Sequence, residues 1–158
     1  MKVARVTLSD RASEGEYDDL SGPEIERVFN SLGFEGILWI RIVMPDEQRR
    51  IEEMLRRLCD AERCDLILTT GGTGPAPRDV TPEATRAVIE RELPGFGEIM
   101  RVQSFAKVPT AILSRSTAGT RGRTLIVNLP GNPRAIGECL PLVVQAIREA
   151  LRHLAGEK

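Results

Sequence analysis

Short apolar runs that resemble strands alternate along this chain with segments whose apolar residues repeat at helical spacing. In the segment from Ile25 to Leu32, for example, the apolar side chains recur every three or four residues and therefore share one helix face. Such alternation is typical of βαβ units. We therefore expect an α/β fold, a three-layer sandwich with a mostly parallel central sheet. Strands are expected at Val3–Leu8, Gly36–Val43, Leu66–Thr70, Thr110–Leu113 and Thr124–Leu129.

Start and stop signals bound several of the expected helices. Gly33 is suited to end the first of them, and Thr81 followed by Pro82 is a typical helix start. The 158 residues contain no evident linker or internal repeat, so residues 1–158 are expected to form a single domain. Helices are expected around Ile25–Leu32, Ile51–Cys59, Thr81–Arg91, Phe96–Ala106 and Ile136–Leu154.

Composition argues against several classes of partner. The formal net charge is −1 and aromatic residues make up 4% of the chain, which disfavours nucleic-acid binding. No apolar stretch is long enough to span a bilayer, and the N-terminus lacks the pattern of a signal peptide. The three cysteines form an odd set that suits a reducing compartment. We therefore expect a cytoplasmic protein with small-molecule substrates and neither a nucleic-acid nor a membrane partner.

Unusual residues follow four of the expected strands. In open α/β sheets, ligands bind outside the carboxyl ends of the strands. Polar or conformationally special residues at all four ends therefore predict one composite site rather than four unrelated turns. The four segments are Ser9–Arg11, Met44–Glu47, Gly71–Gly74 and Pro130–Pro133.

The segment Gly71–Gly74 has the composition of a phosphate-binding loop. Glycine adopts positive φ without strain and lets the backbone approach a ligand closely, and successive N–H groups can then surround an anion. A short glycine run is a weak motif, and a plain tight turn after the strand is the alternative. The segment matches neither a Walker A sequence nor a Rossmann fingerprint.

Three aspartates lie near these segments. Mg²⁺ in proteins usually takes one or two carboxylates together with substrate phosphates and water, so Asp46, Asp65 and Asp79 are candidate catalytic residues. Each also has a structural alternative. Asp46 could cap the following helix, and Asp65 could form a turn at the strand entry. Asp79 could pair with Arg78 or hold the turn before Thr81 and Pro82.

Several basic residues could contact phosphate groups, although surface arginines are common and each could equally be an ordinary surface residue. These residues are Arg11, Arg78, Lys107, Arg115 and Arg123.

These motifs together resemble the family that comprises MogA, MoaB and the G domain of gephyrin. The resemblance covers nearly the whole chain, and its long central motif is highly specific. The matching segments are Ser9–Ser13, Pro45–Glu47, Asp65–Gly74, Arg78–Thr85, Glu92–Gly95, Leu113–Ser116 and Asn128–Pro133.

The resemblance implies a molybdopterin adenylyltransferase. In that reaction the terminal phosphate of molybdopterin attacks the α-phosphate of ATP, pyrophosphate leaves, and Mg²⁺ assists. The family also implies a homotrimer. No second domain for molybdate insertion is present, so the product would be handed to a molybdate-inserting protein.

The resemblance further implies roles for individual residues. It assigns catalysis to Asp46, Asp79 and Asp65, and metal binding to Asp46 and Asp79. Nucleotide or pterin binding is implied for Ser9, Asp10, Thr70, Gly71, Gly72, Thr73, Gly74, Ser104, Ser114, Pro130, Gly131 and Asn132.

Two alternative functions stay open on the same fold, because one fold hosts unrelated activities. One is a non-catalytic molybdopterin-binding or scaffold protein of the MoaB type. The other is nucleotide hydrolysis. The complete glycine loop and acidic set favour the enzyme, since a protein that only binds a pterin has no need of metal ligands.

Overall fold

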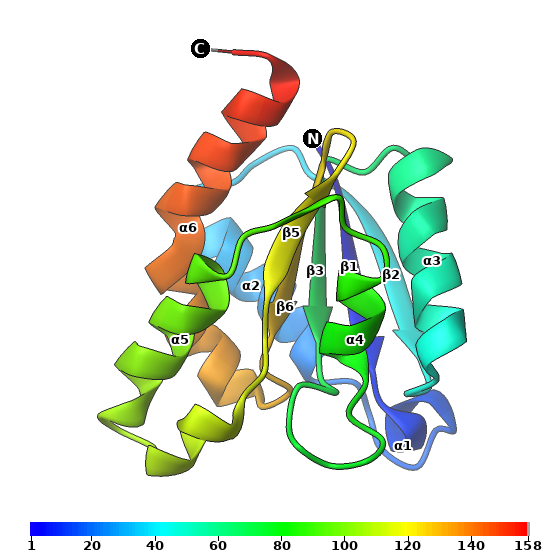
Figure 1. Ribbon diagram of the computed structural model, residues 1–158, viewed down its shortest axis with the longest axis vertical. Coiled ribbons are helices and arrows are strands. Elements are labelled where there is room, and N and C mark those ends of the chain that lie inside the picture. Colours follow the sequence, from blue (N-terminus) through cyan, green and yellow to red (C-terminus); the bar gives the residue numbers. More distant parts are fainter. Residues whose placement is uncertain (158) are drawn as a thin grey trace.

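The computed structural model describes residues 1–157 and has three layers, with a central sheet between two layers of helices (Figure 1). The strands are β1 (Lys2–Leu8), β2 (Leu38–Met44), β3 (Leu66–Thr70), β4 (Arg91–Glu92), β5 (Ala118–Arg121) and β6 (Thr124–Leu129). The helices are α1 (Asp10–Ser13), α2 (Ser21–Ser31), α3 (Gln48–Asp60), α4 (Thr81–Arg86), α5 (Gly95–Phe105), the 3₁₀ helix η1 (Pro109–Leu113) and α6 (Pro133–Ala155). None of the helices within these 157 residues combines the length and apolar character needed to cross a membrane.

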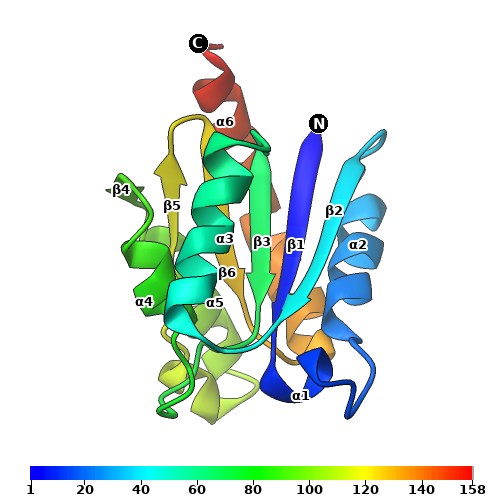
Figure 2. The same cartoon turned by 90° about the vertical axis from the view of Figure 1, so that its right-hand side faces the viewer.

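The sheet has the strand order β2-β1-β3-β6-β5-β4. Strands β2, β1, β3 and β6 run parallel, whereas β5 and β4 are antiparallel to their neighbours (Figure 2). The prediction of a mostly parallel sheet inside a three-layer sandwich is therefore confirmed. Because the four parallel strands share one direction, their carboxyl ends meet at one edge of the sheet.

Two hydrophobic clusters hold the three layers together. In β3, Leu66 and Leu68 face the cluster under α2, α5 and α6, while Ile67 faces the cluster under α3 and α4. All three side chains are fully buried. This explains the continuous apolar run of the strand, since both faces of a parallel sheet are covered. Full burial of each such side chain contributes about 1.5–3 kcal/mol.

Helix α4 is shorter than predicted. It ends at Arg86 rather than near Arg91, and residues 91–92 form β4. The N–H groups of Glu90 and Leu93 donate to the carbonyls of Thr120 and Ala118, each at 2.7 Å. These bonds pair the backbone of residues 90–93 with β5 at the edge of the sheet, so the helix does not continue.

The segment Thr110–Leu113, for which the sequence predicts a strand, lies instead in the 3₁₀ helix η1. Pro109 begins this helix, and the Ile112 side chain is exposed rather than packed against a sheet. The antiparallel neighbour of β6 is the unpredicted strand β5, joined to it by a tight turn at Gly122 with φ of +52°. A further short helix, α1, follows β1 directly and is not among the predicted helices.

Candidate active site

Two clefts lie side by side where the parallel strands end. The first, here called the polar cleft, has a volume of about 410 Å³ and is lined by residues that follow β1, β2 and β3. The second, the α5–α6 cleft, has a volume of about 450 Å³ and lies between α5, η1 and the first turns of α6. Gly131 lines the polar cleft, whereas its neighbours Pro130 and Asn132 line the α5–α6 cleft. The loop after β6 therefore separates the two.

The structure divides the predicted binding residues between these clefts. Those at the polar cleft are Ser9, Asp10, Asp46, Thr70, Gly71, Gly72, Asp79 and Gly131. Those at the α5–α6 cleft are Ser104, Ser114, Pro130 and Asn132. Thr73 and Gly74 line neither cleft, and their carbonyl groups instead accept hydrogen bonds from Arg115.

Asp65 does not join the other aspartates. It precedes the first residue of β3, and its Oδ2 accepts a hydrogen bond of 2.7 Å from the N–H of Lys2. The five residues of β3 then separate it from the glycine loop, a length of ~16 Å. Its predicted place in the composite site is therefore wrong, because its strand runs toward that site and not away from it. The turn at the strand entry is the role that the structure supports.

The glycine loop depends on two left-handed residues. Gly71 has φ of +93° and Gly72 has φ of +63°. A Cβ on Gly71 would collide with the carbonyl oxygen of Leu8, so the backbones of the β1 and β3 loops touch here. Thr81 holds the loop from the other side, since its N–H donates to Gly72 O at 3.1 Å and its Oγ1 donates to Gly71 O at 2.9 Å. The loop is thereby shaped before any ligand arrives.

The ends of β1 and β2 are joined by a reciprocal pair of hydrogen bonds. The N–H of Asp10 donates to Asp46 Oδ2 at 3.1 Å, and the N–H of Asp46 donates to Asp10 Oδ1 at 3.0 Å. Arg78 also binds both oxygens of Asp10, from Nε at 2.9 Å and from Nη2 at 2.7 Å. The hydrogen bonds from Arg78 hold the pKa of Asp10 below its ordinary value, so Asp10 is ionised and paired.

Asp46 is the least satisfied acid at the polar cleft. Its Oδ1 is buried without a hydrogen-bond partner, and within residues 1–157 it is the one buried side-chain oxygen or nitrogen of which this is true. Burial raises the pKa of Asp46, and the neighbouring carboxylates of Asp10 and Asp79 raise it further. A divalent cation bound here would be the missing partner of the unpaired carboxylate oxygen and would also contact the second acid.

Asp79 supplies that second acid. One of its oxygens, Oδ2, accepts a hydrogen bond of 3.0 Å from the N–H of Ala76, which orients the carboxylate within its own loop. Nowhere in the described part of the chain do three or more His, Cys, Asp or Glu side chains form a group that could hold a metal ion by itself. Mg²⁺ commonly binds through one or two protein carboxylates plus oxygens of its ligand, so Asp46 and Asp79 have the chemistry to hold such a cation.

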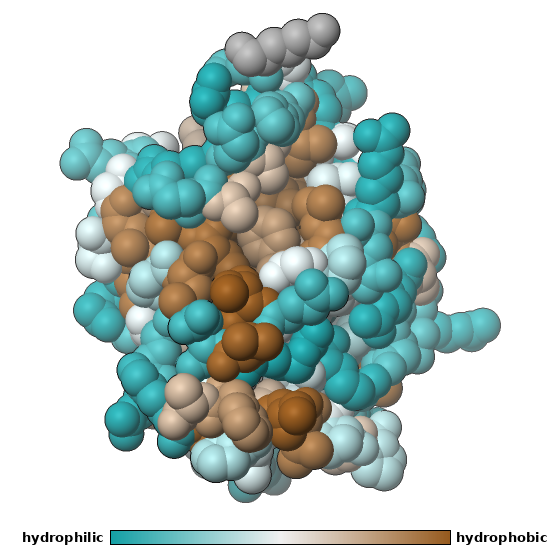
Figure 3. All heavy atoms as spheres, turned by 60° about the vertical axis from the view of Figure 1, so that its left-hand side comes forward, coloured by the Kyte–Doolittle hydropathy of each residue, from teal (hydrophilic) through white to brown (hydrophobic). Residues whose placement is uncertain are grey.

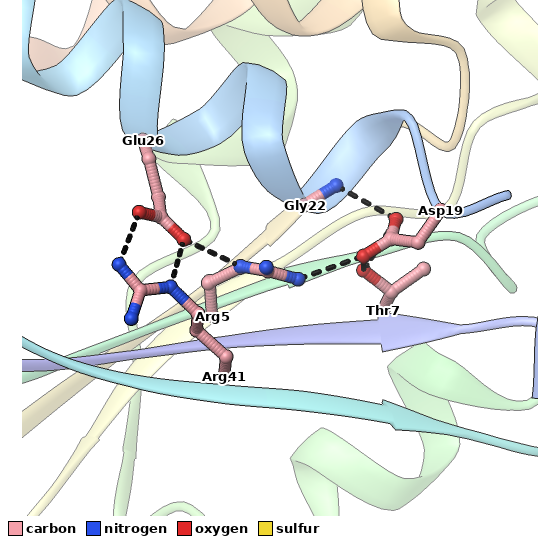
Figure 4. A network of polar contacts seen from close by, with 6 residues as sticks. All are labelled: Arg5, Thr7, Asp19, Gly22, Glu26 and Arg41. Carbon is pink, nitrogen blue, oxygen red and sulfur yellow. Dashed lines mark hydrogen bonds and ion pairs between the residues drawn. The ribbon is translucent and has the colours of Figure 1, made fainter.

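A network of charged side chains adjoins the polar cleft (Figure 4). The sequence patterns do not predict it. Asp19 lines the cleft and accepts from Arg5 Nη1 at 2.7 Å, from Thr7 Oγ1 at 3.0 Å and from the N–H of Gly22 at 2.9 Å. Arg5 also donates through Nε to Glu26 at 2.9 Å. An arginine in the middle of an otherwise apolar strand was the available signal, because a buried charge requires partners.

The α5–α6 cleft offers a different chemistry. Ser104 Oγ lies 3.5 Å from Cys139 Sγ, and burial raises the pKa of the Cys139 thiol, which therefore stays neutral. Lys107 and Arg134 line this cleft together with Glu138, with which both pair, and Arg101 lines it as well. The cleft therefore combines apolar walls with an excess of positive charge that suits an anionic ligand. Arg123, by contrast, lines hollows at the opposite edge of the sheet together with Asp65.

Comparison with known proteins identifies the relatives of this chain. The family model described as "Probable molybdopterin binding domain" matches residues 4–153. The chain belongs to this family. Among the members of the molybdopterin-binding family that it resembles is the molybdopterin adenylyltransferase of Helicobacter pylori (strain J99), which is 51% identical over 154 residues, or 98% of this chain and 88% of the relative.

Two further relatives agree with this assignment. The molybdopterin adenylyltransferase of Escherichia coli (strain K12) is 48% identical over 153 residues, which cover 97% of this chain and 78% of the relative. The crystal structure of the molybdopterin biosynthesis enzyme MoaB from Thermus thermophilus superposes with a TM-score of 0.87 at 44% identity. That match covers 99% of this chain and 97% of the other. The predicted membership of the MogA and MoaB family is therefore confirmed.

Proposed function

We propose that this chain is a molybdopterin adenylyltransferase of molybdenum cofactor biosynthesis, which transfers AMP from ATP to the terminal phosphate of molybdopterin. The observation that carries the proposal is the match to proteins of that name at about half identity over 98% of the chain. The two adjoining clefts support it, because a transfer between two bound molecules requires two neighbouring binding sites.

In the proposed reaction, an oxygen of the terminal phosphate of molybdopterin attacks the α-phosphorus of ATP. The bond from that phosphorus to the bridging oxygen of the β-phosphate breaks, and pyrophosphate leaves with the electron pair. No covalent enzyme intermediate is required. The work of the protein is to position the two phosphates and to balance their charge.

The polar cleft is the proposed site for the ATP phosphates. Gly71 and Gly72 let the backbone approach the triphosphate closely, and Asp46 and Asp79 would hold Mg²⁺. The metal supplies charge neutralisation on the phosphate oxygens when bound. Asp10 and Arg78 neutralise one another in the ligand-free protein, which leaves the orphaned oxygen of Asp46 as the unsatisfied metal ligand.

The α5–α6 cleft is the proposed site for molybdopterin. Its Ser104 and Ser114 offer hydroxyl groups, and Lys107 and Arg134 offer positive charge for the phosphate end. Asn132 lines this cleft directly beside Gly131 of the polar cleft, so the terminal phosphate of the pterin would meet the nucleotide across this loop.

A pyrophosphate-release assay tests the proposal. Purified protein is expected to release pyrophosphate only when ATP, molybdopterin and Mg²⁺ are all present, and reactions that omit one of them serve as controls. The alternative function, a pterin-binding scaffold, predicts binding of molybdopterin without release of pyrophosphate. Phosphate release from ATP in the absence of pterin would instead favour nucleotide hydrolysis.

We also propose that residues 1–158 form one domain of a cytoplasmic homotrimer, which passes its product to a molybdate-inserting protein. Apolar residues gather on the side of the molecule that carries α5 and α6 (Figure 3). An apolar groove of about 340 Å³ on this side is lined by Leu93, Pro94, Gly95, Phe96, Ile99, Leu142, Val143 and Ala146. The family resemblance implies further copies of this chain, and we propose that a second copy covers this groove.

A further inference from the structure

Arg115 joins the two clefts through one side chain. Its neighbours Ser114 and Ser116 both line the α5–α6 cleft. Its own N–H donates to Thr73 O at 2.8 Å, and its Nε donates to Gly74 O at 2.9 Å. Arg115 therefore crosses from the wall of one cleft to the loop that forms the other.

The far end of the Arg115 guanidinium reaches the acidic side of the polar cleft. Its Nη2 donates to the carbonyl oxygen of Asp79 at 2.7 Å, and its Nη1 pairs with the Glu83 carboxylate at the start of α4. Four separate points on the segment from Thr73 to Glu83 are thus held by one arginine. This segment carries Asp79, one of the two proposed metal ligands.

The backbone that carries Arg115, residues 114–116, is also held in place. Arg101 of α5 donates through Nη1 to the carbonyl oxygens of Ser114 and Ser116, at 3.2 and 3.0 Å. The backbone on both sides of Arg115 is therefore anchored to α5, which forms a wall of the α5–α6 cleft. Because the Arg115 donors bond to protein acceptors on the loop side, the residue is not placed to bind a phosphate.

We infer that Arg115 is a positioning residue that sets the α5–α6 cleft in register with the polar cleft, an inference that rests on the proposed function. Phosphoryl transfer requires the attacking oxygen and the phosphorus to lie about 3–3.5 Å apart and in line. The two reactants bind to different segments of the chain, so their alignment depends on whatever ties these segments together. Arg115 is that tie.

The test compares Arg115→Lys with Arg121→Gln. A lysine keeps the charge but lacks the planar fork that reaches Gly74, Asp79 and Glu83 together. Arg121 is a matched control, because it likewise pairs with a carboxylate, Asp60, and donates to a backbone carbonyl, but it lines neither cleft.

We expect kcat of Arg115→Lys to fall about 100-fold, the effect of misplacing a reactant by about 1 Å. The KM values for ATP and molybdopterin should stay unchanged, since each ligand still has its own cleft. Arg121→Gln should keep both kcat and KM. An unchanged kcat in Arg115→Lys would overturn the inference, and so would a rise in KM alone, because that result would indicate direct contact with a substrate.

A second measurement does not depend on turnover. In hydrogen–deuterium exchange of the ligand-free proteins, the amides of residues 73–80 should exchange faster in Arg115→Lys than in the wild type or in Arg121→Gln. Equal exchange in all three would overturn the inference. If Arg115→Lys does not fold, Glu83→Gln replaces it, because it removes the carboxylate partner of Arg115 and leaves the three backbone acceptors in place; its residues 73–80 should exchange faster than those of the wild type, and equal exchange would overturn the inference. A wild-type protein without turnover would count against the proposed function, and the exchange data would still decide the role of Arg115.

Discussion

The carboxylate of Asp46 is held in an unfavourable state. Its Oδ1 is buried and unpaired, and the carboxylates of Asp10 and Asp79 lie nearby. Burial and these like charges raise its pKa, so the ionised form costs stability in the ligand-free protein. Strain of this kind persists where function needs it, because a bound cation would relieve it. The chemistry of this residue therefore predicts opposite effects of one substitution on activity and on stability.

Asp46→Asn should abolish Mg²⁺-dependent pyrophosphate release and stabilise the folded protein by about 0.5–2 kcal/mol at neutral pH. Asparagine retains an oxygen that can accept from the N–H of Asp10, but it carries no charge. Because the pKa of Asp46 is raised on folding, its contribution to stability is present below the ordinary value of 3.8 and is lost as pH rises through the raised value. The gain in the variant should therefore vanish at the acid end of the range.

Denaturant unfolding of both proteins across the acid and neutral range measures this difference. Asp65→Asn is the control, because Asp65 lies at the other end of β3 and should be dispensable for turnover. If Asp46→Asn keeps full activity, the assignment of Asp46 as a metal ligand is wrong. Equal stability of the two proteins at neutral pH would show that the carboxylate is already compensated.

At the level of elements, β1 and α2 are joined through buried charge rather than through apolar packing alone. The side chains of Arg5 and Asp19 are only 9% and 13% exposed, so neither charge is well hydrated. This contact requires a glycine at position 22, because a Cβ there would collide with Arg5 and Asp19. The network in Figure 4 thereby sets the loop that brings Asp19 to the polar cleft.

Arg5→Met should destabilise the fold by about 3–5 kcal/mol, because it leaves the Asp19 carboxylate buried without its counter-charge. Arg41→Met removes a second arginine from the same network, but that side chain is 57% exposed and should cost no more than about 1 kcal/mol. Urea unfolding of the two variants beside the wild type provides the comparison. Losses of similar size would mean that burial of Arg5 adds nothing to its ion pairs.

The elements that sequence patterns predict best are those buried on both faces. Strands β3 and β6 begin and end at the predicted residues because their apolar runs are continuous. Strand β5 is not predicted, since the residues Ala118–Arg121 show neither an apolar run nor clear alternation. The segment Thr110–Leu113 has the β-branched residues of a strand, but it has no sheet partner and its Ile112 is exposed.

The candidate site follows the same logic. Strand ends predict which loops meet, because the parallel order brings them to one edge. For Asp65 the order of the chain already indicates the outcome, because this residue precedes the strand Leu66–Thr70 and therefore lies at its amino end. Pattern alone cannot reveal that Arg115 bonds inward, since that depends on the fold around Asp79 and Glu83.

At the scale of the whole molecule, apolar residues gather on the side formed by α5 and α6, and an apolar groove lies there (Figure 3). The Ile99 side chain of α5 is 39% exposed and that of Leu142 on α6 is 43% exposed, and both line the apolar groove. Isolated exposed apolar residues are ordinary, but a contiguous group marks an interaction surface. The proposed homotrimer would cover this surface and remove it from water.

Leu142→Glu should convert the proposed trimer to a 17.5 kDa monomer without unfolding it. A charge buried in an apolar interface costs several kcal/mol, whereas at an exposed position of the isolated chain the change lies within about 0.5 kcal/mol. Sedimentation equilibrium gives the mass, and circular dichroism shows that the fold persists. Leu38→Glu is the matched control, because Leu38 is 64% exposed on β2, at the other edge of the sheet, and its variant should stay trimeric. A monomeric wild type would refute the trimer. A trimeric Leu142→Glu would place the interface on another face, and the α5–α6 side would then be free for the protein that receives the product.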